Sequence, residues 1–141
     1  MRISARNILS GTIAGINKGI VMSEVIITLK SGFKICSYIT NESVDNLNLK
    51  VHNKAYAIVK ATSVQISQSH KAPALGTENT LEGTIARLKE GLAMGEVMID
   101  LGEGDMLSAS ITDGRIKRLA LRASHEVYAT FKPTSVIIGV D

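Results

Sequence analysis

Aromatic residues and cysteine are scarce in this chain of 141 residues, and tryptophan is absent. Phe and Tyr make up 4% of the residues, so the core must be built from aliphatic side chains. This scarcity disfavours a binder of single-stranded nucleic acid, because such proteins stack bases on exposed aromatic rings. Cys36 is the only cysteine, which excludes an intrachain disulfide and favours a reducing compartment.

Long apolar runs and strong charge are also lacking. No apolar run approaches the ~20 residues of a membrane-spanning helix, and residues 1–4 lack the apolar core of a signal peptide. The net charge is +3 at pH 7, with a pI near 9.1. This mild bias suits an anionic ligand, but it falls short of the clustered basic surface of nucleic-acid binders. No nucleotide-binding glycine pattern, zinc-ligand spacing or catalytic constellation occurs, so we expect no enzymatic activity.

The chain repeats itself with a constant shift of 72 residues, the distance from Gly11 to Gly83. Residues 7–14 (NILSGTIA) match 79–86 (NTLEGTIA), and the shift holds without a gap from position 7 to position 66. Self-similarity at a fixed period indicates two copies of one structural unit. We therefore assign residues 1–67 to unit 1, the polar stretch 68–75 to a linker, and residues 76–141 to unit 2.

Within each unit the pattern is mostly that of β-strands. Apolar residues alternate in 25–29 and again in 97–101, as expected for half-buried strands. Residues 41–49 have a short helical spacing with Thr40 as a candidate N-cap, and 55–66 is rich in β-branched residues. This order predicts a mostly β fold of two tandem OB-like five-stranded barrels, each with a short helix.

Each unit is small and can bury only a small fraction of its surface. We therefore expect the two units to pack against each other or against further copies of the chain. This makes the chain a candidate homo-oligomer.

Several polar side chains could together hold an anion. Ser4 and Arg6 offer a hydroxyl and a guanidinium fork ahead of the first strand. Thr40 and Ser43 stand at the predicted helix start, where free N–H groups and the dipole favour an anion. The same pair also fits a plain N-cap without a ligand. Lys60 stands among apolar residues, where it also fits an ordinary solvent-facing lysine.

The combined pattern resembles the molbindin family, the Mop or TOBE-type domains that bind molybdate and tungstate. The stretches that carry the resemblance are Ser4-Ala5-Arg6-Asn7, Gly11, Lys18-Gly19, Ser23-Glu24-Val25, Ile39-Thr40-Asn41-Glu42-Ser43 and Val59-Lys60-Ala61-Thr62-Ser63-Val64. The tandem layout is similar to that of the two-unit, di-Mop molbindins. The resemblance implies a cytoplasmic trimer of two-unit chains without catalysis, with molybdate or tungstate bound at interfaces between units.

By position, the resemblance implies oxyanion contacts from five side chains and two backbone N–H groups of unit 1. The side chains are Ser4, Arg6, Thr40, Ser43 and Lys60, and the N–H groups lie near Ala5 and Ala61. A tetrahedral dianion needs several converging donors and positive charge, and this set supplies both.

Unit 2 departs from this pattern. The positions of the first serine and the arginine hold Gly76 and Glu78, and the position of the second serine holds Arg115. Thr112 and Lys132 remain as candidate oxyanion contacts. The Glu78 carboxylate would repel an oxyanion, whereas Arg115 could return a positive charge. We expect intact sites from unit 1 and degraded sites from unit 2.

The leading interpretation is a cytoplasmic protein that binds molybdate or tungstate for intracellular molybdenum storage and homeostasis, with no nucleic-acid or membrane partner. Two alternatives from other classes stay open. One is a nucleic-acid-binding OB module, and the other is an interaction module without a ligand.

Overall fold

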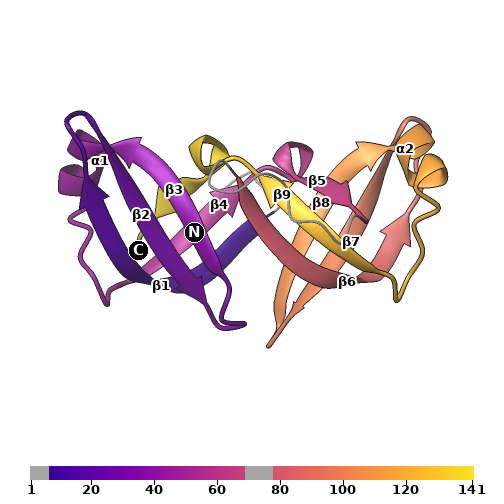
Figure 1. The fold of residues 1–141 in the computed structure, drawn as a ribbon, viewed down its shortest axis with the longest axis horizontal. Coiled ribbons are helices and arrows are strands. Elements are labelled where there is room, and N and C mark those ends of the chain that lie inside the picture. Colours follow the sequence, from indigo (N-terminus) through magenta and orange to yellow (C-terminus); the bar gives the residue numbers. More distant parts are fainter. Residues whose placement is uncertain (1–6, 69–77) are drawn as a thin grey trace.

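The computed structural model describes residues 7–68 and 78–141, which form two five-stranded β-sheets. Each sheet curls into an OB-like barrel, and the two barrels lie side by side (Figure 1). The prediction of a mostly β chain with two OB-like barrels and short helices is confirmed. No helix in these two ranges is long and apolar enough to cross a membrane.

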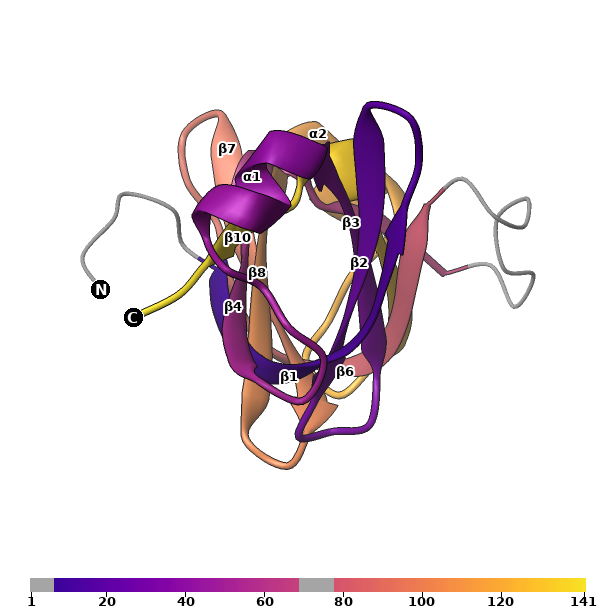
Figure 2. The same cartoon turned by 90° about the vertical axis from the view of Figure 1, so that its left-hand side faces the viewer.

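The two halves of the chain repeat the same order of elements. The first half holds β1 (Asn7–Lys18), β2 (Met22–Leu29), β3 (Lys34–Thr40), α1 (Asn41–Asn46), β4 (Lys54–Val59), the 3-10 turn η1 (Ala61–Ser63) and β5 (Gln65–Ser67). The second half holds β6 (Asn79–Lys89), β7 (Met94–Gly102), β8 (Asp105–Thr112), α2 (Asp113–Arg118), β9 (Glu126–Phe131), η2 (Pro133–Ser135) and β10 (Ile137–Gly139). Each helix covers one end of its barrel, as Figure 2 shows for α1.

The barrel cores are built almost entirely from aliphatic side chains, as the composition requires. Val25 and Ile27 of β2 are fully buried, and so are their equivalents Val97 and Ile99 of β7. Phe131 of β9 is the one aromatic ring among the buried core residues that the structure describes. The alternation in the sequence therefore marks the inward face of each sheet correctly.

The fifth strand of each sheet comes from the other unit. The strand orders are β10-β4-β1-β2-β3 and β5-β9-β6-β7-β8. Gln65 of β5 lies opposite Thr130 of β9, and Ile137 of β10 lies opposite Ile58 of β4. The predicted boundary at residue 67 therefore ends a sequence repeat, but the strand before it belongs to the second sheet. The 72-residue repeat cannot predict this exchange, because equivalent strands of the two units have equivalent edges available for pairing.

Two equivalent asparagines join each barrel to the other. The Asn7 side chain donates to the Ser108 carbonyl at 2.8 Å and accepts from the Ser108 N–H at 2.7 Å. Asn79 makes the same pair of bonds with Cys36, at 2.9 and 2.8 Å. Both asparagines are buried, with 2% and 6% of their surface exposed. Each amide thus acts as an additional peptide group paired to the outer strand of the opposite barrel.

Two equivalent glycines lie where the first strand of each unit presses closely on the second. A Cβ on Gly11 would come within 2.5 Å of the Thr28 carbonyl oxygen, and one on Gly83 within 2.5 Å of the Ile99 Cγ2. Neither neighbour can retreat, because both belong to paired strands and Ile99 is fully buried. The sequence match between Gly11 and Gly83 therefore reflects a steric requirement.

We predict that Gly11→Ala or Gly83→Ala lowers the free energy of unfolding by about 2 kcal/mol or more, because the new methyl group overpacks a rigid strand contact. Urea unfolding followed by circular dichroism would measure this loss. Gly114→Ala is the control, since its Cβ meets nothing within 4 Å and alanine favours the helix. An equal loss in all three variants would contradict the steric explanation.

We predict that Asn79→Ala lowers the free energy of unfolding by about 2–4 kcal/mol, because the Cys36 N–H and carbonyl lose their partners at the junction of the barrels. The same measurement on Asn46→Ala, an exposed position in α1, should show a change below about 0.5 kcal/mol. A small effect of Asn79→Ala would mean that water replaces the amide freely.

Candidate functional site

The predicted hydroxyl pair lies at the first turn of α1. Thr40 has extended backbone angles (φ −68°, ψ 151°), and its Oγ1 accepts from the Ser43 N–H at 3.1 Å. The Thr40 hydroxyl donates to Ser43 Oγ at 2.8 Å. The N-cap prediction is confirmed, and Thr40 is exposed while Ser43 is half-buried. Two hydroxyl oxygens are thereby held together at one exposed corner of the first barrel.

The loop between β1 and β2 is fixed against this corner. The Asn41 side-chain amide donates to the Gly19 carbonyl at 2.9 Å, and the Asn41 N–H donates to the Val21 carbonyl at 2.8 Å. The Ser23 hydroxyl donates to the Asn41 side-chain oxygen. The start of α1 therefore holds the loop and the hydroxyl pair in one rigid arrangement.

Lys60 lies elsewhere in the molecule. It directly precedes η1, and η1 packs against β8 of the other barrel, whereas α1 packs on β2 and β3 of its own barrel. Lys60 is exposed, and its side chain makes no hydrogen bond or ion pair with the residues that the structure describes. Ala61, the first residue of η1, is buried and has an N–H that no carbonyl within the turn accepts. One chain therefore does not bring Lys60 to the Thr40–Ser43 pair.

Three of the predicted contacts, Ser4, Ala5 and Arg6, lie outside the described residues. Their placement relative to the hydroxyl pair stays a prediction.

The corresponding corner of unit 2 has different chemistry. Thr112 caps α2, and its Oγ1 accepts from the Arg115 N–H at 3.2 Å. The Arg115 guanidinium reaches the Ile66 carbonyl in β5 at 3.4 Å. Glu78 is half-buried ahead of β6, and Lys132 precedes η2, which packs against β3. The small second hydroxyl of unit 1 is thus replaced by a long cation directed toward the exchanged strand.

The sequence analysis assigned no structural role to Asn7, Asn41 or Asn79. The available signal was the identity of Asn7 and Asn79 at the shift of 72, a polar residue retained at the same point of both first strands. No group of three His, Cys, Asp or Glu side chains within 7–68 and 78–141 could hold a metal ion.

Cys36 is chemically quiet although its strand β3 is at a sheet edge. Burial raises the pKa of the Cys36 thiol from 9.0 to about 11, and the Glu24 carboxylate acts in the same direction. The pKa of Tyr38 is raised as well, chiefly by the neighbouring charge of Cys36. The thiol therefore stays protonated at neutral pH and is a poor nucleophile. Its contribution to stability is complete below pH 9.0 and is lost as the pH rises through about 11.

We predict that iodoacetamide alkylates Cys36 in the folded protein roughly 50-fold more slowly at pH 9 than in the urea-unfolded protein. At this pH the thiolate fraction falls from half at a pKa of 9.0 to roughly 1% at a pKa of about 11. Mass spectrometry at several pH values would give both rates. Equal rates at pH 9 would show that the thiol is not protected.

Comparison with known proteins agrees with this architecture. The model of the TOBE domain matches the chain twice, over residues 3–66 and 76–138. The chain is 29% identical over 140 residues to "Molybdenum transport protein ModE" of Herbaspirillum seropedicae, covering 99% of this chain but 52% of that protein. It is 44% identical over 66 residues to "Molybdenum-pterin-binding protein 2" of Clostridium pasteurianum, covering 47% of this chain and 97% of that protein. The chain thus spans about half the length of the ModE relative.

One solved structure matches over its whole length. The cytoplasmic molybdate-binding protein ModG, crystallised with molybdate bound, superposes with a TM-score of 0.94 at 32% identity. The match covers 100% of both chains. Together with the two TOBE matches, this shows that the chain belongs to the TOBE-domain family, as a tandem, molbindin-type member.

Proposed function

We propose that this protein binds molybdate and tungstate as free oxyanions and buffers molybdenum in the cytoplasm. The observation that carries the proposal is the full-length likeness to ModG, a cytoplasmic molybdate-binding protein, at 32% identity. The donor set supports it, since hydroxyl, ammonium and guanidinium groups all donate to an oxyanion. The chain binds its ligand and performs no reaction on it.

The proposed unit 1 site is shared between copies of the chain. Thr40 and Ser43 of one copy supply the hydroxyl pair, and Lys60 of another copy supplies the ammonium group. The separation of Lys60 from α1 within one chain supports this division. The same site takes Ser4 and Arg6 as further contacts, with N–H groups near Ala5 and Ala61.

Exposed apolar side chains support the homo-oligomer that such a shared site requires. Ile20 and Val21 are 99% and 65% exposed at the β1–β2 loop, and Leu92 is fully exposed at the equivalent β6–β7 loop. Asn41 holds the first loop in place, so its apolar tip is presented rigidly. We propose that the loops contact other copies in a trimer of two-unit chains, with the ions at the interfaces.

We propose that the unit 2 sites are degraded. Glu78 brings a carboxylate where unit 1 has Arg6, and the Arg115 guanidinium is directed toward the Ile66 carbonyl. Thr112 and Lys132 alone offer too few donors to replace this loss. The assembly therefore binds fewer ions than two intact units per chain would allow.

Calorimetric titration with molybdate and tungstate, with sulfate and phosphate as competitors, tests the proposal. We expect saturable binding that sulfate does not displace. Lys60→Met and Ser43→Ala should each weaken molybdate binding roughly tenfold or more, because charge-assisted hydrogen bonds contribute about 1.5–3 kcal/mol. Lys50→Met, an exposed lysine after α1, is the matched control.

Absence of heat with either oxyanion would overturn the proposal and favour an interaction module. A salt-sensitive gel shift with single-stranded oligonucleotide would favour the nucleic-acid alternative. If Glu78→Ala or Arg115→Ala abolished binding while Arg6→Ala did not, the assignment of the intact sites to unit 1 would be wrong.

A further inference from the structure

The two barrels carry opposite charge at the ends that hold the β2–β3 and β7–β8 turns. The end of the first barrel, which we call the lysine end, carries Lys30, Lys34 and Lys54, and the carboxylate beside it is that of Asp141, which lines one cavity with Lys54. The end of the second barrel, which we call the carboxylate end, carries Glu82, Asp100, Glu103, Asp105 and Glu126, with His125 directly before Glu126. All of these side chains are exposed except Asp105, which is half-buried.

The strand register shows that these charges occupy equivalent places. One row across the first sheet reads Lys54, Thr12, Thr28 and Lys34. The same row across the second sheet reads Glu126, Thr84, Asp100 and Met106. The two units therefore keep the same scaffold at this end but reverse its charge.

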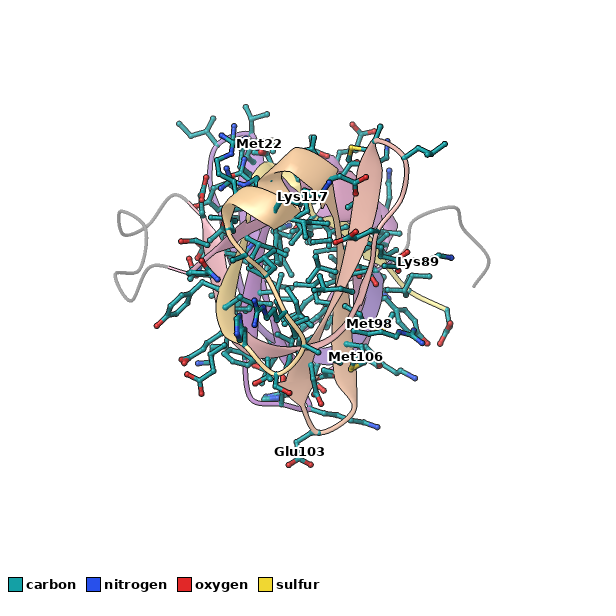
Figure 3. The ribbon with its side chains drawn as sticks, turned by 90° about the vertical axis from the view of Figure 1, so that its right-hand side faces the viewer. Met22, Lys89, Met98, Glu103, Met106 and Lys117 are labelled. Carbon is teal, nitrogen blue, oxygen red and sulfur yellow. The ribbon has the colours of Figure 1, made fainter. Side chains whose placement is uncertain are left out.

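The two ends lie side by side on one side of the molecule. The Ser31 N–H in the β2–β3 turn donates to the Asp105 carboxylate at 2.9 Å. Figure 1 shows the two turns converging below the junction of the barrels. In Figure 3, Glu103 lies at one extreme of the second barrel, and Lys117 of α2 lies at the other. Lysine and carboxylate ends thus form one continuous face, positive on one half and negative on the other.

Among residues 7–68 and 78–141, no ion pair neutralises the charges of this face. The ion pair between residues that the structure describes joins Lys18 and Asp45, at the opposite end of the first barrel. Lys54 lies 5.3 Å from the centre of the Tyr56 ring, and Asp100 accepts a hydrogen bond from the Gly102 N–H. No described carboxylate lies within ion-pair distance of Lys30, Lys34 or Lys54.

We propose that this face pairs with the same face of a second copy of the chain. A two-fold rotation places the lysine end of each copy against the carboxylate end of the other, so every contact occurs twice. A cavity of about 450 Å³ beside Phe33, lined by Glu82, Asp100 and Glu126, offers room for an incoming lysine. The proposal does not depend on oxyanion binding.

The pairing is electrostatic and therefore depends on ionic strength. Exposed charges interact over about 10 Å at 0.1 M salt but only about 3 Å at 1 M. The apolar loops proposed to join copies in the trimer lie at the opposite end of β2 and β7, and apolar contact persists in high salt. The two modes of association are thus separable, and either can fail without the other.

Sedimentation velocity at about 20 mM and about 500 mM NaCl tests the proposal. The wild-type protein should show additional self-association at low salt, weakened at least about tenfold at high salt. The variant Lys30→Glu/Lys34→Glu/Lys54→Glu, in which both ends are acidic, should lose this association. So should Asp100→Lys/Glu103→Lys/Glu126→Lys, in which both ends are basic.

Mixing the two variants in equal amounts is the decisive measurement. Their opposite faces should restore low-salt association, which also shows that both variants are folded. The control Lys89→Glu/Lys117→Glu/Arg118→Glu changes the net charge equally at the other end of the second barrel and should behave like the wild type. The proposal would be overturned if the wild-type protein had the same sedimentation coefficient at both salt concentrations. It would also be overturned if the mixed variants did not associate, or if the control variant lost the low-salt association.

Discussion

Each barrel is closed by a strand from the other half of the chain, and this exchange ties the two halves together. Without β10 the edge of β4 would be open, and without β5 the edge of β9 would be open, so neither barrel is complete within its own half of the chain. An open edge exposes unpaired backbone groups, and the exchange satisfies both edges at once. Asn7 and Asn79 add a second connection of the same kind, because each amide pairs with the backbone of the opposite barrel.

This exchange also decides where the proposed anion-binding groups can meet. The chain leaves the first barrel at Lys60 and enters the second through η1, so the lysine is carried away from the hydroxyl pair at α1. A site that uses all these groups must combine separate copies. If the donors are divided between copies as proposed, ligand binding is linked to assembly, since an oxyanion bound there would stabilise the interface.

The two units have kept their interiors and changed their surfaces. The buried faces of β2 and β7 remain aliphatic, and Gly11 and Gly83 remain because no side chain fits. Surface positions differ freely between the units: Arg115 occupies the position equivalent to Ser43, and Glu126 occupies the position equivalent to Lys54. Packing restricts the interior, whereas an exposed position tolerates either charge until it contacts a ligand or another copy. The chemical differences between the two units therefore lie at the surface, where ligands and other copies could be contacted.

The repeat, the alternating strands, the Thr40 N-cap and the family could all be predicted from the sequence, because they depend on local spacing and on residues close together in the chain. The proximity of Thr40 and Ser43 could also be predicted, since residues three positions apart at the start of a helix are neighbours. Three features are visible only in the folded chain: β5 and β10 change partners, Asn7 and Asn79 join the barrels, and Lys60 lies apart from α1. These are choices between equivalent strand edges and between distant segments, and local spacing within either copy does not distinguish them.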